Sequence, residues 1–430
     1  MADSERRANR RTVPASGGAA KQGFFRRKRN SLLILLLAVV IVIGAAFLLR
    51  LLEQHSNAAE TAAEPVTYET ATLTAVGDIS IDDGVLASAQ QADGSYDFTN
   101  AFLNVAGLLS ASDLTVGNLE LTFSGEPYGG NGCSAPPSLA DTLKTLGFDI
   151  LQTANSKSLD GGMSGLAATL STVRNSGIEP LGTYATQAER SASGGVLLKE
   201  VGGIRIAFLA FTKGFDGMSI PTGSDYCADV LYQDYDTQYS KVNTTAIQNA
   251  ITAAKALSPD VIVAMVHWGS EYKMAVSESQ TAITKLMFEN GVDVILGSHS
   301  HMVGPMELQS VTRTDGTVKE VLLCNSLGNF LSSASRDYAQ ESVVLNLAFS
   351  KNSTTGETEI SHVEYVPVYL AGTADSTSGR FEILDVYQSI ALYDSAYLGR
   401  VSDAVHDKLL QTISDLQEHT GTDWDRGPLS

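Results

Sequence analysis

Residues 291–301 read GVDVILGSHSH, a short apolar run that ends in a glycine and two histidines. A run of this length, rich in branched side chains and bounded by glycine, is typical of a buried β-strand. The same design recurs in ATLTAVGD at 71–78, DLTVGNLE at 113–120 and DVIVAMVHWG at 260–269. These four segments therefore predict strands that each carry polar groups at the carboxyl end.

Segments with helical periodicity alternate with the strands, because their apolar residues recur every three or four positions. Alternation of strand and helix predicts an α/β fold with a largely central sheet. The predicted helices are 99–110, 138–147, 165–177, 243–257, 279–291 and 402–419.

Charge is divided unevenly between the start of the chain and its body. Residues 1–50 contain ten Lys or Arg and two acids, a net charge of +8. Because the whole chain carries −19, the remainder carries −27. Such an acidic body excludes nucleic acid as its partner, since a phosphate backbone binds a positive surface. Electrostatic binding of any other polyanion to this acidic body would need a metal ion between the two.

An uncharged run of 18 residues, Leu32–Leu49, follows nine Lys or Arg. Its length suits one membrane crossing, and the positive-inside rule places the N-terminus in the cytoplasm and the body outside. The alternative is a signal peptide cleaved near Ser56-Asn57-Ala58, although the apolar run is long for that role. The expected plan is a basic cytoplasmic segment (1–30), a transmembrane anchor (31–50), a linker (51–70), a main domain (71–375) and a C-terminal extension ending in a helix (376–430).

The chain has three cysteines. Cys133 and Cys227 lie in loop-like sequence, and Cys324 ends the apolar run VLLC. An exported domain can form disulfides, so Cys133–Cys227 is the expected pair if one bridge exists. Three free thiols are the alternative, which spacing alone does not exclude.

Carboxylate and imidazole side chains gather at the ends of the predicted strands, where open α/β sheets place their sites. Two carboxylates and three imidazoles suit Mn, Zn or Fe better than Ca, and they suffice for one or two ions. In an extended backbone, His299 and His301 would project to the same side. The expected metal ligands are Asp78, Glu120, His267, His299 and His301.

A simpler interpretation stays open for each of these residues taken singly. A histidine after a strand is more often a satisfied polar group than a ligand. A carboxylate in the same place often caps the next helix. Only their recurrence at several strand ends favours a metal site.

An ordered set of short motifs resembles the signature of the CapA family, which is linked to synthesis or export of capsular poly-γ-glutamate. The resemblance runs from about residue 71 to about residue 370 and is specific because it has several parts in a fixed order. The motifs are Gly77-Asp78, Gly117-Asn118-Leu119-Glu120, His267-Trp268-Gly269 with Glu271-Tyr272, Gly297-Ser298-His299-Ser300-His301 and Ser326-Leu327-Gly328-Asn329-Phe330.

The resemblance implies a four-layer α-β-β-α sandwich of the calcineurin-like metallophosphoesterase type, preceded by one transmembrane helix. It implies that the five residues above correspond to metal ligands. It also implies further pocket residues, namely Asn118, Asn155, Ser156, Asp160, Glu271 and Asn329.

One motif departs from the family. Its members carry Asn-Asn-His after the third strand, with a metal-binding Asn followed by a proton-donating His. Alignment through Asp160-Gly161 places Ser156 at the Asn position and Lys157 at the His position. A lysine with an ordinary pKa is a cation and a poor proton donor at neutral pH. The sequence therefore leaves open whether a metal-dependent hydrolase activity survives and whether any residue is catalytic.

Three functions follow from these observations. The leading one is capsule or envelope-polymer biosynthesis or export, with an outer domain that handles an anionic polymer such as poly-γ-glutamate beside membrane-bound synthase subunits. The second is a metal-dependent phosphoesterase acting on envelope phosphoesters. The third is a catalytically degenerate scaffold for a membrane polymer synthase.

The predicted topology can be tested with a reporter fused after Ser430. Because nine basic residues precede the apolar run, a reporter that is active only in the cytoplasm should be silent there. The same reporter fused before the run, at Arg29, is the matched control and should be active. Equal signals from the two fusions would contradict the topology.

Overall fold

The computed structural model describes residues 36–53, 66–130, 133–376, 378–395 and 401–428. The chain divides into two compact units, Met1–Val66 and Thr67–Ser430. In the first unit, a helix spans Leu36–Glu53 and is long and apolar enough to cross a membrane. Its side chains are exposed along its length. The predicted basic segment, the start of the predicted anchor and most of the predicted linker lie outside the described residues.

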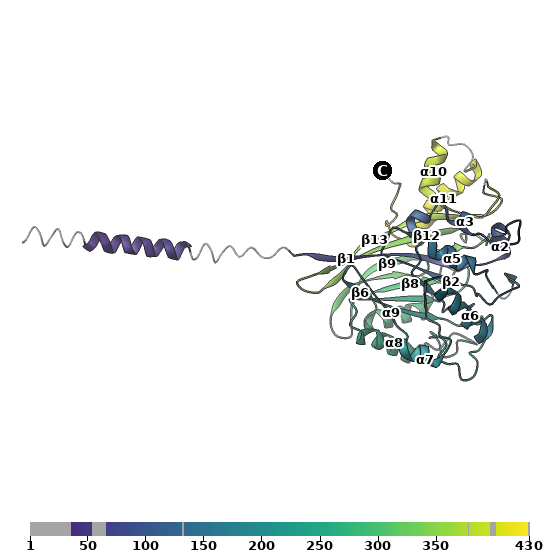
Figure 1. Ribbon diagram of the computed structural model, residues 1–430, viewed down its shortest axis with the longest axis horizontal. Helices are drawn as coiled ribbons and strands as arrows, with labels where there is room; N and C mark the ends of the chain where they lie inside the picture. Colours follow the sequence, from purple (N-terminus) through teal and green to yellow (C-terminus); the bar gives the residue numbers. More distant parts are fainter. Residues whose placement is uncertain (1–35, 54–65, 131–132, 377, 396–400, 429–430) are drawn as a thin grey trace, which may run out of the picture. The chain divides into compact units, whose positions relative to one another are not determined.

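The second unit is built on two β-sheets (Figure 1). In the first sheet the longest strands lie in the middle, where β1 pairs antiparallel with β12 and parallel with β2. A short strand, β11 (Asn329–Leu331), pairs with the end of β1. The other strands, in spatial order, are β14 (Glu382–Asp385), β13 (Thr358–Ala371), β12 (Glu341–Asn352), β1 (Tyr68–Ser80), β2 (Leu114–Glu120), β3 (Ile150–Gln152) and β4 (Glu179–Leu181).

In the second sheet the four central strands are parallel to one another. The strand at each edge is antiparallel to its neighbour. Its strands, in spatial order, are β5 (Leu197–Val201), β6 (Ile204–Thr212), β7 (Val261–His267), β8 (Val294–Ser298), β10 (Val318–Cys324) and β9 (Met306–Thr312).

Strand β6 shows how the layers arise. Its residues Ile206 and Phe208 pack into the apolar core between the two sheets, while Ala207 and Leu209 pack into the cluster under the helices on the outer face. Successive side chains of a strand point to opposite faces, so a strand with apolar residues in both sets has to be covered on both sides.

Helices form the two outer layers. Helices α8 (Thr244–Ala256) and α9 (Glu278–Asn290) cover the second sheet, and helices between β1 and β4 cover the first. The α-β-β-α sandwich is therefore confirmed. The remaining helices are α2 (Asp83–Ala89), α3 (Thr99–Phe102), α4 (Ala106–Leu109), α5 (Ser138–Thr145), α6 (Gly162–Asn175), α7 (Gln187–Ser193), α10 (Val386–Asp394) and α11 (Asp403–Thr420).

The helix expected over 99–110 is two separate short helices, α3 and α4. The break comprises residues 103–105 and includes Asn104, a residue with poor helix propensity. Phe102, Val105 and Leu109 are all buried in the same apolar cluster. The apolar residues of this segment therefore reach the core although the helix is interrupted.

The segment after residue 375 contributes to the sandwich through β14, which pairs with β13 at the edge of the first sheet. The predicted last helix is present as α11, which begins after the Ser402 cap and ends before Gly421. Leu409 of α11 packs in one cluster with Tyr369 of β13.

Two glycines bring the ends of strands from different sheets against one turn, residues 325–328. A Cβ atom on Gly77, in β1, would lie 1.9 Å from the carbonyl oxygen of Gly328, and one on Gly297, in β8, would lie 2.0 Å from that of Asn325. Backbone hydrogen bonds fix both contacts, from Asp78 N to the Gly328 oxygen (2.9 Å) and from Leu327 N to the Gly297 oxygen (3.2 Å). Only glycine permits approaches this close.

The expected Cys133–Cys227 disulfide is wrong, because all three cysteines are free. Cys227 is fully buried in an apolar cluster with Phe215 and Leu159, whereas Cys133 packs against a different cluster, under the first sheet. The two thiols thus belong to different apolar clusters.

Candidate metal centre

The five expected ligands lie together at the carboxyl ends of the strands. Asp78 and Glu120 come from the ends of β1 and β2 in the first sheet, and His267 comes from the end of β7 in the second. His299 and His301 directly follow β8. The exposed fraction is 0% for Asp78 and His267 and 2% for Glu120 and His299, so the site lies at the buried seam between the sheets.

These side chains form two groups that could each hold a metal ion. Asp78, Glu120 and His301 make the first cation group, and Glu120, His267 and His299 make the second; within each group the ligand atoms lie within 4.8 Å of one another. Mixed carboxylate and imidazole ligands suit first-row divalent metals. Glu120 belongs to both groups, and a shared carboxylate is suited to two neighbouring ions.

Three buried atoms of the centre have no hydrogen-bond partner: His267 Nε2 and His299 Nδ1 of the second cation group, and Oε2 of Glu120, which belongs to both groups. A buried polar atom without a partner costs about 1–3 kcal/mol. One such atom has many explanations, but three atoms on three of the five potential ligands fit a bound ion that completes their interactions.

The imidazoles divide into two neutral rings and one cation. Burial lowers the pKa of His267 to about 3 and that of His299 to about 2. Burial also acts to lower the pKa of His301, but the charges of Glu120 and Asp78 outweigh it and raise this pKa to about 10. His301 Nδ1 lies 3.4 Å from Asp78 Oδ2 and 3.9 Å from Glu120 Oε2. Its proton therefore supplies a positive charge between two buried carboxylates.

Amide and hydroxyl groups of neighbouring residues contact the expected ligands and orient them. Asn118 Nδ2 donates to Asp78 Oδ1 at 2.7 Å and lies 3.3 Å from His267 Nδ1. His267 Nδ1 is also 3.0 Å from Ser298 Oγ. His301 Nδ1 is 2.9 Å from Asn329 Oδ1. Contacts of this kind fix the orientation of metal ligands.

The segment that departs from the family reaches the site through Ser156. Its hydroxyl donates to Glu120 Oε1 at 2.7 Å, next to the second cation group. The amide of Asn155 instead donates to Leu119 O (2.7 Å) and Asn118 Oδ1 (3.1 Å). Of these two residues, Ser156 is therefore the one that contacts Glu120 through its side chain.

Lys157 and Asp160 lie farther out. Lys157 Nζ donates to Asp216 Oδ2 at 2.7 Å. Burial acts to lower the pKa of Lys157, but the hydrogen bond and charge of Asp216 outweigh it and raise the pKa above its ordinary value. Lys157 is therefore a cation and no proton donor at neutral pH. Burial raises the pKa of Asp160 to about 6.

An open pocket of about 530 Å³ gives access to the first cation group. Arg336 stands at its rim with its guanidinium carbon 4.2 Å from the centre of the Tyr272 ring. That ring is itself 5.3 Å from the ring of His301. The lining residues include Glu120, His301, Lys157, Glu271, Tyr272 and Arg336.

Sequence reasoning missed Lys213, Ser298 as a support for His267, and Arg336. Lys213 directly follows β6, so it stands where the other strands carry their site residues. Its Nζ lies 3.2 Å from His299 Nε2. The same signal that found the ligands, a polar residue after a buried strand, could have found this one.

The expected extended backbone at the two histidines is wrong. His299 has φ of 95° and His301 has φ of 60°, so both lie in the left-handed region. Such conformations cost about 1–3 kcal/mol each for residues other than glycine and concentrate at functional sites. The backbone of His299 is held there by a hydrogen bond from its N–H to Asp78 Oδ2 (3.1 Å).

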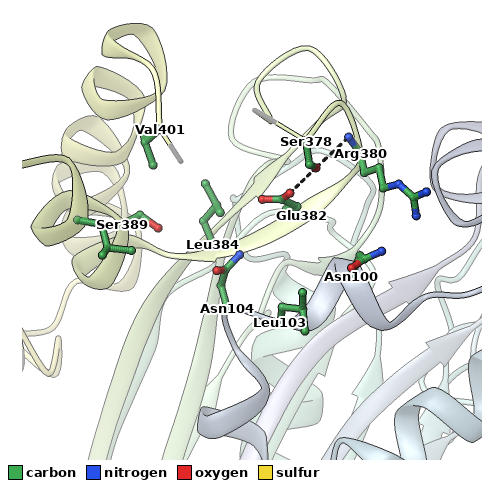
Figure 2. Close-up of a pocket in the computed structure, with 10 residues that line it drawn as sticks. Asn100, Leu103, Asn104, Ser378, Arg380, Glu382, Leu384, Ser389 and Val401 are labelled. Atoms are coloured by element: carbon green, nitrogen blue, oxygen red, sulfur yellow. Dashed lines mark hydrogen bonds between the residues drawn. The ribbon is translucent and has the colours of Figure 1, made fainter. Parts of the chain in front are cut away.

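A second pocket, of about 590 Å³, lies between α3 and the C-terminal segment (Figure 2). Figure 2 shows Ser378, Arg380 and Glu382 on one wall, joined by hydrogen bonds through the Ser378 hydroxyl. Its lining residues include no histidine and none of the expected site residues. The expected site residues therefore lie at the metal centre and not at this pocket.

Comparison with known proteins identifies the family. The profile described as "Bacterial capsule synthesis protein PGA_cap" matches residues 72–334. The chain belongs to this family. It is 27% identical to the capsule biosynthesis protein CapA of Bacillus anthracis over 308 residues, which is 68% of each chain. It is 26% identical to the PGA biosynthesis protein CapA of Bacillus subtilis over 332 residues, which is 74% of this chain and 78% of the relative.

Solved structures also match this member of the capsule synthesis family. One of them is a phosphatase from Mycoplasma pneumoniae with 10% sequence identity and a TM-score of 0.41. The match covers 70% of this chain and 95% of that structure.

The charge on His301 predicts a pH dependence of the metal-free protein. Its pKa rises from an ordinary value of 6.5 to about 10 on folding, so its contribution to stability is complete below pH 6.5 and is lost as the pH rises to 10. The thermal midpoint of the chelated wild type should fall over this range more than that of His301→Gln.

His362→Gln is the matched control, because that histidine is 58% exposed and lies on β13. It should keep the wild-type pH dependence. Parallel curves for wild type and His301→Gln would contradict the assigned charge.

Proposed function

We propose that this protein assists the assembly or export of an anionic cell-envelope polymer, of which poly-γ-glutamate is one candidate. The helix Leu36–Glu53 would anchor it as a single-pass membrane protein with the body outside the cytoplasm. The observation that carries the proposal is the buried centre of two carboxylates and three imidazoles beneath an open pocket, in a chain of the capsule synthesis family. The two Bacillus relatives are named for capsule and PGA biosynthesis.

Electrostatics explains why an acidic domain would need this centre to hold an anionic polymer. The chain without its first 50 residues carries a net charge of −27, which repels a polyanion at long range. A divalent ion at the first cation group would offer open coordination positions to carboxylate or phosphate oxygens. Lys157 and Arg336 add positive charge around the same pocket. An anchor in the membrane would place this domain beside membrane-bound synthase subunits, which are the partners that we expect.

Mn, Zn or Fe fits the ligand set, and Asp78, Glu120, His267, His299 and His301 are the residues that would hold one or two ions. A bound ion would act as a Lewis acid on an oxygen of the polymer or substrate. Asn118, Asn329 and Ser298 would keep the ligands oriented, as their hydrogen bonds do in this structure.

The proposal predicts that the metal centre is needed for polymer at the cell surface. In cells that lack their own copy of this gene, the wild-type chain should restore surface acidic polymer, measured by extraction and uronic-acid, phosphate and glutamate assays. Asp78→Asn combined with His301→Gln should reduce the restored amount at least about tenfold, because second-shell changes alone cost 10–100-fold in metal affinity.

His362→Gln, on the exposed surface away from the centre, should restore polymer fully. Equal protein levels of the three forms in the membrane fraction are the control for folding. Full restoration by the double variant would overturn the proposal.

A metal-dependent phosphoesterase is the second candidate, and Glu120 favours it because this carboxylate belongs to both cation groups. Two ions about one bridging ligand can clamp the attacking and leaving oxygens of a phosphoester. Against it stand the Ser156 hydroxyl at the amide position and the charged Lys157 at the proton-donor position. Loss of a general acid costs about 10²–10⁴ in rate. If these two replacements abolish hydrolysis completely, the domain would serve only as a scaffold.

Restoring the family residues tests this second candidate. Ser156→Asn combined with Lys157→His should raise metal-dependent hydrolysis of a generic phosphodiester by about 100-fold or more, because it supplies an amide ligand and a titratable proton donor. The single variant Lys157→Ala is the control and should leave a low wild-type rate unchanged. Rapid hydrolysis by the wild type, abolished in Lys157→Ala, would instead make Lys157 a catalytic residue.

A further inference from the structure

One hydrogen bond in the metal centre opposes metal binding. Lys213 Nζ lies 3.2 Å from His299 Nε2 and donates to the carbonyl oxygen of Gly269 at 2.9 Å. An ammonium group has three N–H donors and no acceptor, so Nε2 of His299 is the acceptor of this bond. A neutral imidazole whose Nε2 accepts carries its proton on Nδ1.

Nδ1 is the nitrogen of His299 that is left for the second cation group. It is buried and has no hydrogen-bond partner, like His267 Nε2 in the same group. A metal ligand has to present a lone pair, so a proton on Nδ1 prevents coordination. Moving this proton to Nε2 would point an N–H group at the ammonium of Lys213, and two donors would then face each other.

At the other two imidazoles, the groups around Nδ1 are neutral or carry negative charge. Nδ1 of His267 lies 3.0 Å from the Ser298 hydroxyl, which can accept its proton, and 3.3 Å from the Asn118 amide nitrogen, which can only donate. The shorter contact favours the tautomer that leaves Nε2 with a free lone pair. Nδ1 of His301 is surrounded by oxygens of Asn329, Asp78 and Glu120. Asp78 and Glu120 are the other members of the first cation group, and the oxygen of Asn329 is the outside acceptor that orients this ring. Among the described residues of the centre, only His299 has a lysine ammonium within hydrogen-bond distance of its ring.

Lys213 is held in place by several contacts. Its backbone N–H donates to the His267 carbonyl oxygen at 2.8 Å. Its ammonium lies 4.6 Å from the centre of the Tyr239 ring and bonds to Gly269. Displacing the ammonium from His299 would disturb a cation–π contact and a charge-assisted hydrogen bond together.

We propose that Lys213 is a positioning residue that holds His299 in the tautomer unable to bind metal, so that the chain binds one divalent ion at the first cation group and a second ion only weakly. This inference rests on the proposed function, because it requires the metal centre to bind ions. Ser156 acts in the same direction, since it gives the second cation group a hydroxyl in place of an amide.

The test uses the full chain in detergent, freed of metal by chelation and titrated with Mn²⁺ alone. Free Mn²⁺ is followed by its electron paramagnetic resonance signal. The variants are Lys213→Gln, whose amide oxygen can accept from Nε2–H, Lys213→Met, which removes the donor, and Lys213→Arg, which keeps a donor-only cation. Thermal melts of the metal-free variants check that each is folded.

The wild type and Lys213→Arg should bind one Mn²⁺ tightly and a second at least about tenfold more weakly. Lys213→Met and Lys213→Gln should tighten the second ion by about ten- to hundredfold, the range of other changes behind metal ligands, and leave the first unchanged. Two ions of equal affinity in the wild type, or identical behaviour of the Gln and Arg variants, would overturn the inference while leaving the proposed function intact. No Mn²⁺ binding by any form would overturn both.

Discussion

The structure depends on two close backbone contacts at the turn 325–328. Gly77 packs against the carbonyl oxygen of Gly328, and Gly297 packs against the carbonyl oxygen of Asn325. The two glycines lie in different sheets, Gly77 in β1 and Gly297 in β8. The same short turn therefore fixes the position of β1 relative to β8. Asp78 follows Gly77 directly, and His299 lies two residues after Gly297. A larger residue at either glycine would therefore separate ligands that are far apart in sequence.

Once the strand ends meet, electrostatics determines the rest of the centre. Two carboxylates are buried together, and a buried charge without compensation is costly. In this structure the proton on His301 provides the nearest positive charge. The neutral rings of His267 and His299 provide none. The same arrangement would accept a divalent ion in exchange for a proton, which links occupancy of the centre to pH.

Much of this arrangement follows from the sequence because the ligands obey a local rule. Asp78, Glu120 and His267 each end a buried apolar run, and parallel strands bring such ends to one edge. The two histidines after β8 also converge as expected, although their left-handed backbone has no sequence signal. The long apolar strands and the last helix follow from periodicity in the same way.

Other features depend on contacts that no local pattern reveals. The edge strands β4 and β14 are only three and four residues long, too short to give an apolar run. The contact of Lys213 with His299 joins residues 86 positions apart. The separation of Cys133 and Cys227 is decided by which apolar cluster each one joins. Only the assembled fold determines these contacts.

Strand β1 also has a mechanical consequence. It begins at Tyr68, directly after the N-terminal unit, and it pairs with β12 from Tyr68 to Ala75 and with β2 along its other edge. A pull on the N-terminal segment would act along the axis of this strand. The hydrogen bonds to both neighbours lie across that axis, so they would be loaded in shear and would have to break together rather than one by one. The chain thus enters its domain through a strand suited to bear tension.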